Sequence, residues 1–202
     1  MTLRLARRAL APCVLACALG CLGGGPRPDF FTLSAAAGAE QIQPLARRPE
    51  LGLAIGPIEF PRYLDRQEMV TRDGAHRLVL WNAHRWGGSL RTDILRTMAT
   101  DLGALLGTAR LAVYPAEARF PIDFRVLLEI VELDSVPGTS VTLRARFTVA
   151  SGTDGRAIVV EEVGFEEPVS SPAWEDLVSA QRAALGRVNR EIAARIAALP
   201  AQ

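Results

Sequence analysis

One short stretch limits the fold of this chain more than any other. From position 141 to position 149, apolar and polar side chains alternate without a break. The apolar positions are Val141, Leu143, Ala145, Phe147 and Val149, and the polar ones are Thr142, Arg144, Arg146 and Thr148. Successive side chains of a strand point to opposite faces of its sheet. The alternation therefore predicts a strand with one face in a core and one in water, which is typical of antiparallel sheets.

The flanking segments predict that this strand is the middle of a meander. Residues 123–133 form an apolar, β-prone run, and Pro137-Gly138 then predicts a turn. Asp154-Gly155 predicts a second tight turn, which leads into a strand over residues 158–165. The short connections make the three strands neighbours and antiparallel.

Two segments have the spacing of amphipathic helices. The first runs from Leu90 to about Leu106, with Ser89 as its N-cap and Gly107 as its left-handed end. The second follows Ser171, with Pro172 at the first helical position. Two such helices covering one face of a largely antiparallel sheet give the predicted fold class, an α+β two-layer sandwich.

The remaining elements complete a single domain over residues 30–199. Residues 51–56 form a buried-strand candidate that ends at Pro57, and residues 111–114 form another short strand. Asp73-Gly74 separates two strand candidates, residues 68–72 and 77–81, which is a strong signal of a β-hairpin. We expect one domain with no internal repeat.

Composition excludes several classes of function. The 202 residues carry a formal net charge of +1, which argues against a general nucleic-acid-binding protein. All basic residues are arginine, so Schiff-base and P-loop lysine chemistry is excluded. His76 and His84 match no metal-ligand spacing, and Ser89 lacks the Gly-x-Ser-x-Gly pattern of a nucleophile. We predict no catalytic residue, no metal and no cofactor.

The paired charges of the strands do not change this expectation. Neighbouring acids at 161–162 and 166–167 point to opposite faces of a strand, so neither pair can act as an acid/base couple. Arg144 and Arg146 share the polar face, where they could meet an acidic partner or a phosphate. A solvated face is the simpler interpretation of both arginines.

The N-terminus predicts export and lipidation. A basic start followed by an uncharged apolar run over residues 9–20 is typical of a secretory signal peptide, here residues 1–20. Small residues precede Cys21, which resembles the acylated cysteine of bacterial lipoproteins; Cys17 is a second candidate. Residues 21–29 then form a Gly/Pro-rich tether. The alternative is an ordinary secreted protein that loses its cysteines with the signal.

Trp86 lies in a polar, Gly-rich segment at residues 84–88, which predicts a loop. A large ring there either closes the end of the core or marks a contact surface. Both interpretations stay open at this point.

Several motifs together resemble a known family. They are Ile55-Gly56-Pro57-Ile58, Phe60-Pro61-Arg62-Tyr63-Leu64-Asp65-Arg66, Val70-Thr71-Arg72, Phe30-Phe31-Thr32-Leu33, Arg85-Trp86 with Leu90, and Leu105-Leu106-Gly107. In this order they resemble the auxiliary lipoproteins of ABC-type transporters, of the paraquat-inducible protein C (PqiC) type. The resemblance covers residues 21–196, and its Pro-x-Tyr-Leu-Asp-Arg segment is the most specific part.

The resemblance implies a non-enzymatic lipoprotein of the outer membrane that faces the periplasm. It implies an MCE-domain channel protein as partner, intermembrane lipid transport as the process, and a homo-oligomeric ring as the assembly. Candidate contact residues are Pro61, Tyr63, Leu64, Asp65, Arg66 and Trp86; a rigid turn is the competing interpretation of this segment. The alternatives are an envelope-assembly or cell-wall lipoprotein without a transporter, and a periplasmic hydrolase.

Overall fold

The computed structural model describes residues 27–34 and 42–200. The predicted signal peptide, Cys21 and most of the tether lie outside these described residues. The strands are β1 (Asp29–Phe31), β2 (Leu53–Glu59), β3 (Glu68–Asp73), β4 (Arg77–Trp86), β5 (Leu111–Val113), β6 (Phe124–Val136), β7 (Ser140–Ser151) and β8 (Ala157–Pro168). The helices are the short 3₁₀ turn η1 (Arg62–Leu64), α1 (Leu90–Leu106) and α2 (Trp174–Ala197). Within the described residues, no helix is both long and apolar enough to cross a membrane.

A five-stranded sheet in the order β5-β2-β6-β7-β8 forms the main layer. β6, β7 and β8 pair antiparallel, which confirms the predicted meander. Gly138 and Gly155 lie at the two predicted turns, where both adopt positive φ. β2 pairs in parallel with both β5 and β6, because helix α1 carries the chain back between β4 and β5.

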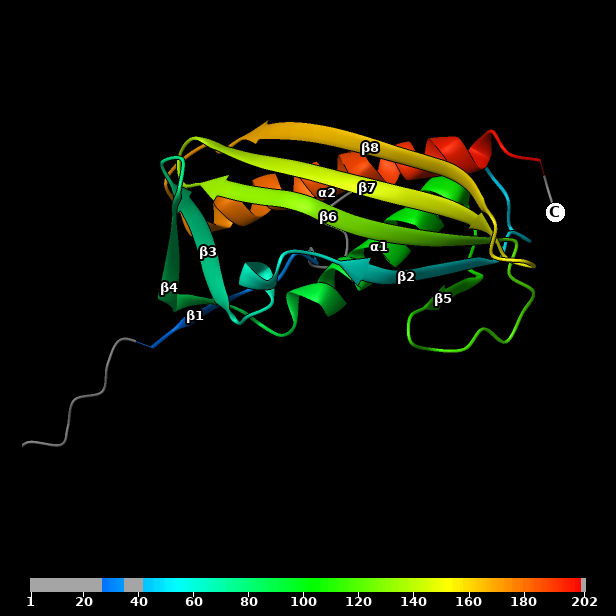
Figure 1. Cartoon of the computed structure of the whole chain (residues 1–202), viewed down its shortest axis with the longest axis horizontal. Coiled ribbons are helices and arrows are strands. Elements are labelled where there is room, and N and C mark those ends of the chain that lie inside the picture. Colours follow the sequence, from blue (N-terminus) through cyan, green and yellow to red (C-terminus); the bar gives the residue numbers. More distant parts are fainter. Residues whose placement is uncertain (1–26, 35–41, 201–202) are drawn as a thin grey trace, which may run out of the picture.

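Both helices cover the same face of this sheet, so the two-layer α+β prediction is confirmed (Figure 1). α1 packs on β2 and β5, whereas α2 packs on β7, β8 and β6. The odd-numbered apolar residues of β7 are the buried ones, with Val141, Ala145, Phe147 and Val149 fully enclosed at 0% exposure. The polar residues of β7 face away from the helices.

The ends of helix α1 agree with the prediction, although its N-cap differs in detail. Gly107 adopts the expected left-handed conformation, with φ at 63°. Ser89 is the N-cap residue, but its hydroxyl makes no capping hydrogen bond. Its backbone carbonyl instead accepts from the Asp93 amide at 3.0 Å.

The predicted start of the second long helix was wrong. Helix α2 begins at Trp174 with Ala173 as N-cap, not at Pro172 after Ser171. Pro172 instead packs against the β6–β7 turn, where a Cβ on Gly138 would come within 3.3 Å of the proline Cγ.

The predicted end of strand β2 was also wrong. It continues through Pro57 to Glu59 rather than ending at Pro57. The strand tolerates this proline because its register with β6 shifts between Ile55 and Ile58, and Gly56 adopts a φ of 96° there. A proline without an amide hydrogen is compatible with a strand at such a bulge.

A second, three-stranded sheet in the order β1-β4-β3 closes one end of the molecule (Figure 1). The predicted hairpin at Asp73-Gly74 is confirmed, since β3 and β4 pair antiparallel across this turn. β4 runs further than predicted and takes in His84 and Trp86, which were expected in a loop. The reason is not local: β1 pairs in parallel with the second half of β4.

Candidate functional site

The segment that carries the family resemblance lies between the two sheets. Pro61 precedes η1, and its carbonyl accepts from the Leu64 amide at 2.9 Å. Leu64 is buried at 6% exposure and so holds the turn to the core. Asp65 and Arg66 follow it and are exposed to solvent.

Arg91, at the start of α1, fixes this segment from the side. Its guanidinium donates to the Ile58 carbonyl and lies 3.3 Å from the Asp65 carboxylate. It also stacks over the Phe60 ring, 4.3 Å from the centroid. No sequence pattern singles out Arg91, because β3 and β4 lie between this helix and the Pro61–Arg66 segment in the chain.

Tyr63 lies near a partly buried ion pair that joins the two sheets. Arg72 on β3 bonds to Asp134 on β6, with a nitrogen–oxygen distance of 2.8 Å. Burial raises the pKa of the Tyr63 hydroxyl, and the Asp134 carboxylate raises it further, whereas Arg72 partly offsets the change. The phenol therefore stays neutral, and its hydroxyl lies where the core meets the Arg72–Asp134 ion pair.

Trp86 occupies the core, which is the first of the two interpretations of this ring. It is 5% exposed, and its backbone amide donates to the Gln67 carbonyl at 2.7 Å. The backbone of Trp86 thus lies next to the end of the Pro61–Arg66 segment, whereas its ring lies in the core. Of the six candidate contact residues, Asp65 and Arg66 are the exposed ones.

An aromatic cluster that the sequence analysis did not foresee joins β1, β4 and α2. His84 stacks on Trp174 with ring centroids 4.3 Å apart, and Trp81 meets Trp174 edge-on at 5.2 Å. Phe31 of β1 lies 6.1 Å from His84. The cluster ties the first described strand to the beginning of α2.

The charged residues of the sheet form ion pairs with one another. Arg146 bonds to Glu129 and Glu162, each at 2.9 Å. Arg144 lies 3.6 Å from Glu132. This pairing agrees with the simpler interpretation of both arginines, a solvated face.

The paired acids of β8 separate as expected. Glu161 bonds to Arg195 of α2, while Glu162 turns to the opposite face and Arg146. The Arg195 hydrogen bonds lower the pKa of Glu161. Among the residues that the structure describes, no group of three His, Cys, Asp or Glu side chains could hold a metal ion.

Comparison with known proteins identifies the family of the chain. Residues 31–193 match the sequence profile of a family described as the ABC-type transport auxiliary lipoprotein component. The chain belongs to this family. The predicted resemblance to PqiC-type lipoproteins is thereby confirmed. No curated protein sequence matches the chain.

Solved structures agree with the fold. Protein XCC0632 from Xanthomonas campestris is similar, with a TM-score of 0.62, 14% identity, and coverage of 75% of this chain and 90% of that chain. A crystal structure of an uncharacterized protein gives a TM-score of 0.64 and 14% identity over 76% of this chain and 96% of that one. At such identities these two structures support the architecture alone.

Proposed function

We propose that this member of the family is an outer-membrane lipoprotein that faces the periplasm. Its role is to assist an MCE-type ABC system in intermembrane lipid transport by docking on the channel protein, as one copy of a ring. The family match over residues 31–193 is the observation that carries the proposal. The signal-like N-terminus with Cys21 supports the anchored location.

The exposed part of the Pro61–Arg66 segment is the proposed docking contact. Asp65 and Arg66 project from a turn that Leu64 and Arg91 hold rigid. A preorganised contact loses little conformational freedom on binding, which favours affinity. Within the described part of the chain, Arg66 makes no ion pair, so its charge is available to a partner.

Site-specific photocrosslinking in cells tests this contact. A photoreactive residue in place of Arg66 is expected to crosslink to an MCE-domain protein. Arg156 provides the control, because its side chain is 80% exposed and lies in the β7–β8 turn. The proposed docking is contradicted if position 66 captures no MCE-domain protein, or if both positions capture it equally.

Mass spectrometry of the mature N-terminus tests the anchor separately. We expect acyl chains on Cys21, and loss of membrane attachment in Cys21→Ala but not in Cys17→Ala. Several acyl chains hold a protein at a membrane far better than one. Retention of Cys21→Ala in the membrane would disprove the assignment.

A further inference from the structure

The chain length between the proposed anchor and the first strand restricts where the domain meets the membrane. About eight peptide units separate Cys21 from Asp29, so a fully extended tether spans at most ~28 Å. Strand β6, with 13 residues, is about 43 Å long at ~3.3 Å per residue. The tether is therefore shorter than the domain, and β1 is the described element held nearest to the acyl chains.

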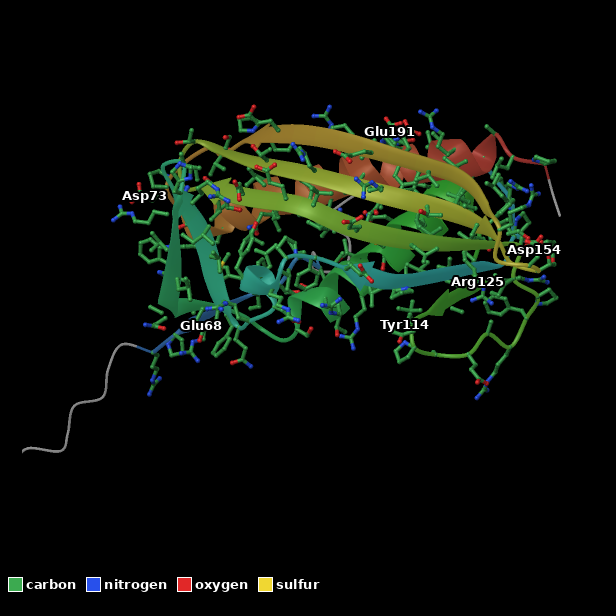
Figure 2. The ribbon with its side chains drawn as sticks, in the orientation of Figure 1. Glu68, Asp73, Tyr114, Arg125, Asp154 and Glu191 are labelled. Atoms are coloured by element: carbon green, nitrogen blue, oxygen red, sulfur yellow. The ribbon has the colours of Figure 1, made fainter. Side chains whose placement is uncertain are left out.

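β1 belongs to the small sheet that closes this end of the molecule, whereas the β7–β8 turn lies at the opposite end (Figure 1). Figure 2 shows Glu68 and Asp73 on the small sheet and Asp154 at the far end. The membrane-proximal end of the domain is thus defined by β1, β3 and β4.

The two faces of β1 differ in what they display. Phe31 pairs in register with the buried Trp86, so this face belongs to the core. Phe30 pairs with Arg85 on the opposite face and is 62% exposed. It is the most exposed of the large apolar side chains in the described residues.

The composition of this outward face fits the interface between lipid and water. Arg85 has Phe30 as its neighbour on β1 and Glu68 as its neighbour on β3. An apolar ring beside a long side chain with a charged end is the combination that favours a lipid headgroup region. Because Glu68 balances Arg85, the face does not require anionic lipid.

The same end of the domain is rigid. Phe31 packs against His84 and Trp174, so β1 is joined to both β4 and α2. A tether that enters through β1 therefore keeps this end of the whole domain, and not a loose arm, within its reach of the bilayer. Trp81 of β4 belongs to the same cluster, whereas Leu80, its neighbour in the strand, points to the opposite face and is 45% exposed.

We propose that the outward face of the small sheet, with Phe30 beside Arg85, lies on the surface of the lipid bilayer. This inference rests on the proposed lipid anchor and deepens it, because it states which surface of the domain the membrane covers. The exposed Asp65 and Arg66 precede Glu68 closely in the chain, so they also lie close to the membrane in this arrangement.

An environment-sensitive label at position 30 tests the proposal in the full lipidated protein. All three cysteines of the chain lie at or before position 21, so a Phe30→Cys substitution in the mature, acylated protein gives a single free thiol. The labelled protein is reconstituted in vesicles of phosphatidylethanolamine and phosphatidylglycerol. Some vesicles also carry a lipid with a quencher near its headgroup.

Val160→Cys is the matched control, because Val160 on β8 is 61% exposed against 62% for Phe30. We expect the quencher lipid to remove most emission from the label at position 30 and little from that at position 160. Iodide in solution is expected to quench the label at position 160 strongly and the label at position 30 weakly. Equal behaviour of the two labels would overturn the proposal, as would protection of position 30 only when the channel protein is added.

Flotation separates this result from a failure of the anchor. If the protein does not float with vesicles, the anchor and the covered face are both refuted. If it floats and position 30 stays open to iodide, the anchor stands and the covered face alone is refuted.

Discussion

Replacement of Asp101 by alanine should cause a large loss of stability, because this carboxylate joins the two helices from a buried position. Its side chain is 3% exposed, and the Arg182 side chain of α2 is 12% exposed. Two nitrogens of Arg182 lie 3.0 Å and 2.7 Å from the carboxylate oxygens, and the Asn189 amide donates to it at 2.7 Å. Asp101→Ala removes the acceptor of all three bonds.

The expected cost follows from the burial of the partners. Removing one member of a buried ion pair costs about 3–5 kcal/mol, because the other charge loses compensation in a medium of low dielectric. Arg182 keeps some contact with water, so we expect the lower end, about 3 kcal/mol. With an m-value of about 2 kcal/mol/M in urea, this cost lowers the unfolding midpoint by about 1.5 M.

Urea unfolding followed by tryptophan fluorescence measures this shift. Glu129→Ala is the control, since it breaks an exposed pair with Arg146, and exposed pairs contribute about 0–1 kcal/mol. Replacing both Asp101 and Arg182 by leucine should restore part of the loss, because the buried charges are removed together while the enclosed Asn189 amide still loses its acceptor. A midpoint in Asp101→Ala within about 0.3 M of the Glu129→Ala value would refute the reasoning.

Two further changes have clear expected outcomes. Gly152→Ala should destabilise by about 2–3 kcal/mol, because a Cβ would lie 1.8 Å from the Ile122 carbonyl oxygen. Gly88→Ala, which meets nothing within 4 Å, should stay within about 0.5 kcal/mol in the same urea assay. Glu161 has a lowered pKa in the folded state because Arg195 donates hydrogen bonds to it. Its ionised carboxylate therefore stabilises the fold fully above the ordinary glutamate pKa. This stabilisation is lost as the pH falls through the lower, folded-state pKa. Glu161→Gln should therefore reduce stability slightly near neutral pH and weaken the decline in acid; an unchanged acid limb would contradict this.

The sequence predicted the meander and both helices well because each of these elements has one buried face. In β7 a shift by one residue would move every apolar side chain into water, so the pattern determines both the strand and its orientation. The hairpin at Asp73-Gly74 was equally predictable, since its turn is determined by two adjacent residues. These features depend on residues that are close in the chain.

The parts that the sequence did not reveal depend on distant residues. β4 extends to Trp86 because β1, more than fifty positions earlier, supplies its pairing partner. Pro57 continues β2 because β6 accommodates a bulge at that point. Arg91 meets Asp65 only after the hairpin has folded back over η1. No local pattern contains this information.

The most specific motif of the family is, for the most part, part of the architecture rather than a free surface. Leu64 is in the core, Tyr63 lies against the Arg72–Asp134 pair, and Asp65 is held by Arg91. These contacts hold the loop between the two sheets in one conformation. It follows that a partner which binds here recognises mainly the exposed residue that this conformation presents, Arg66, and that substitutions at Leu64 report on stability instead.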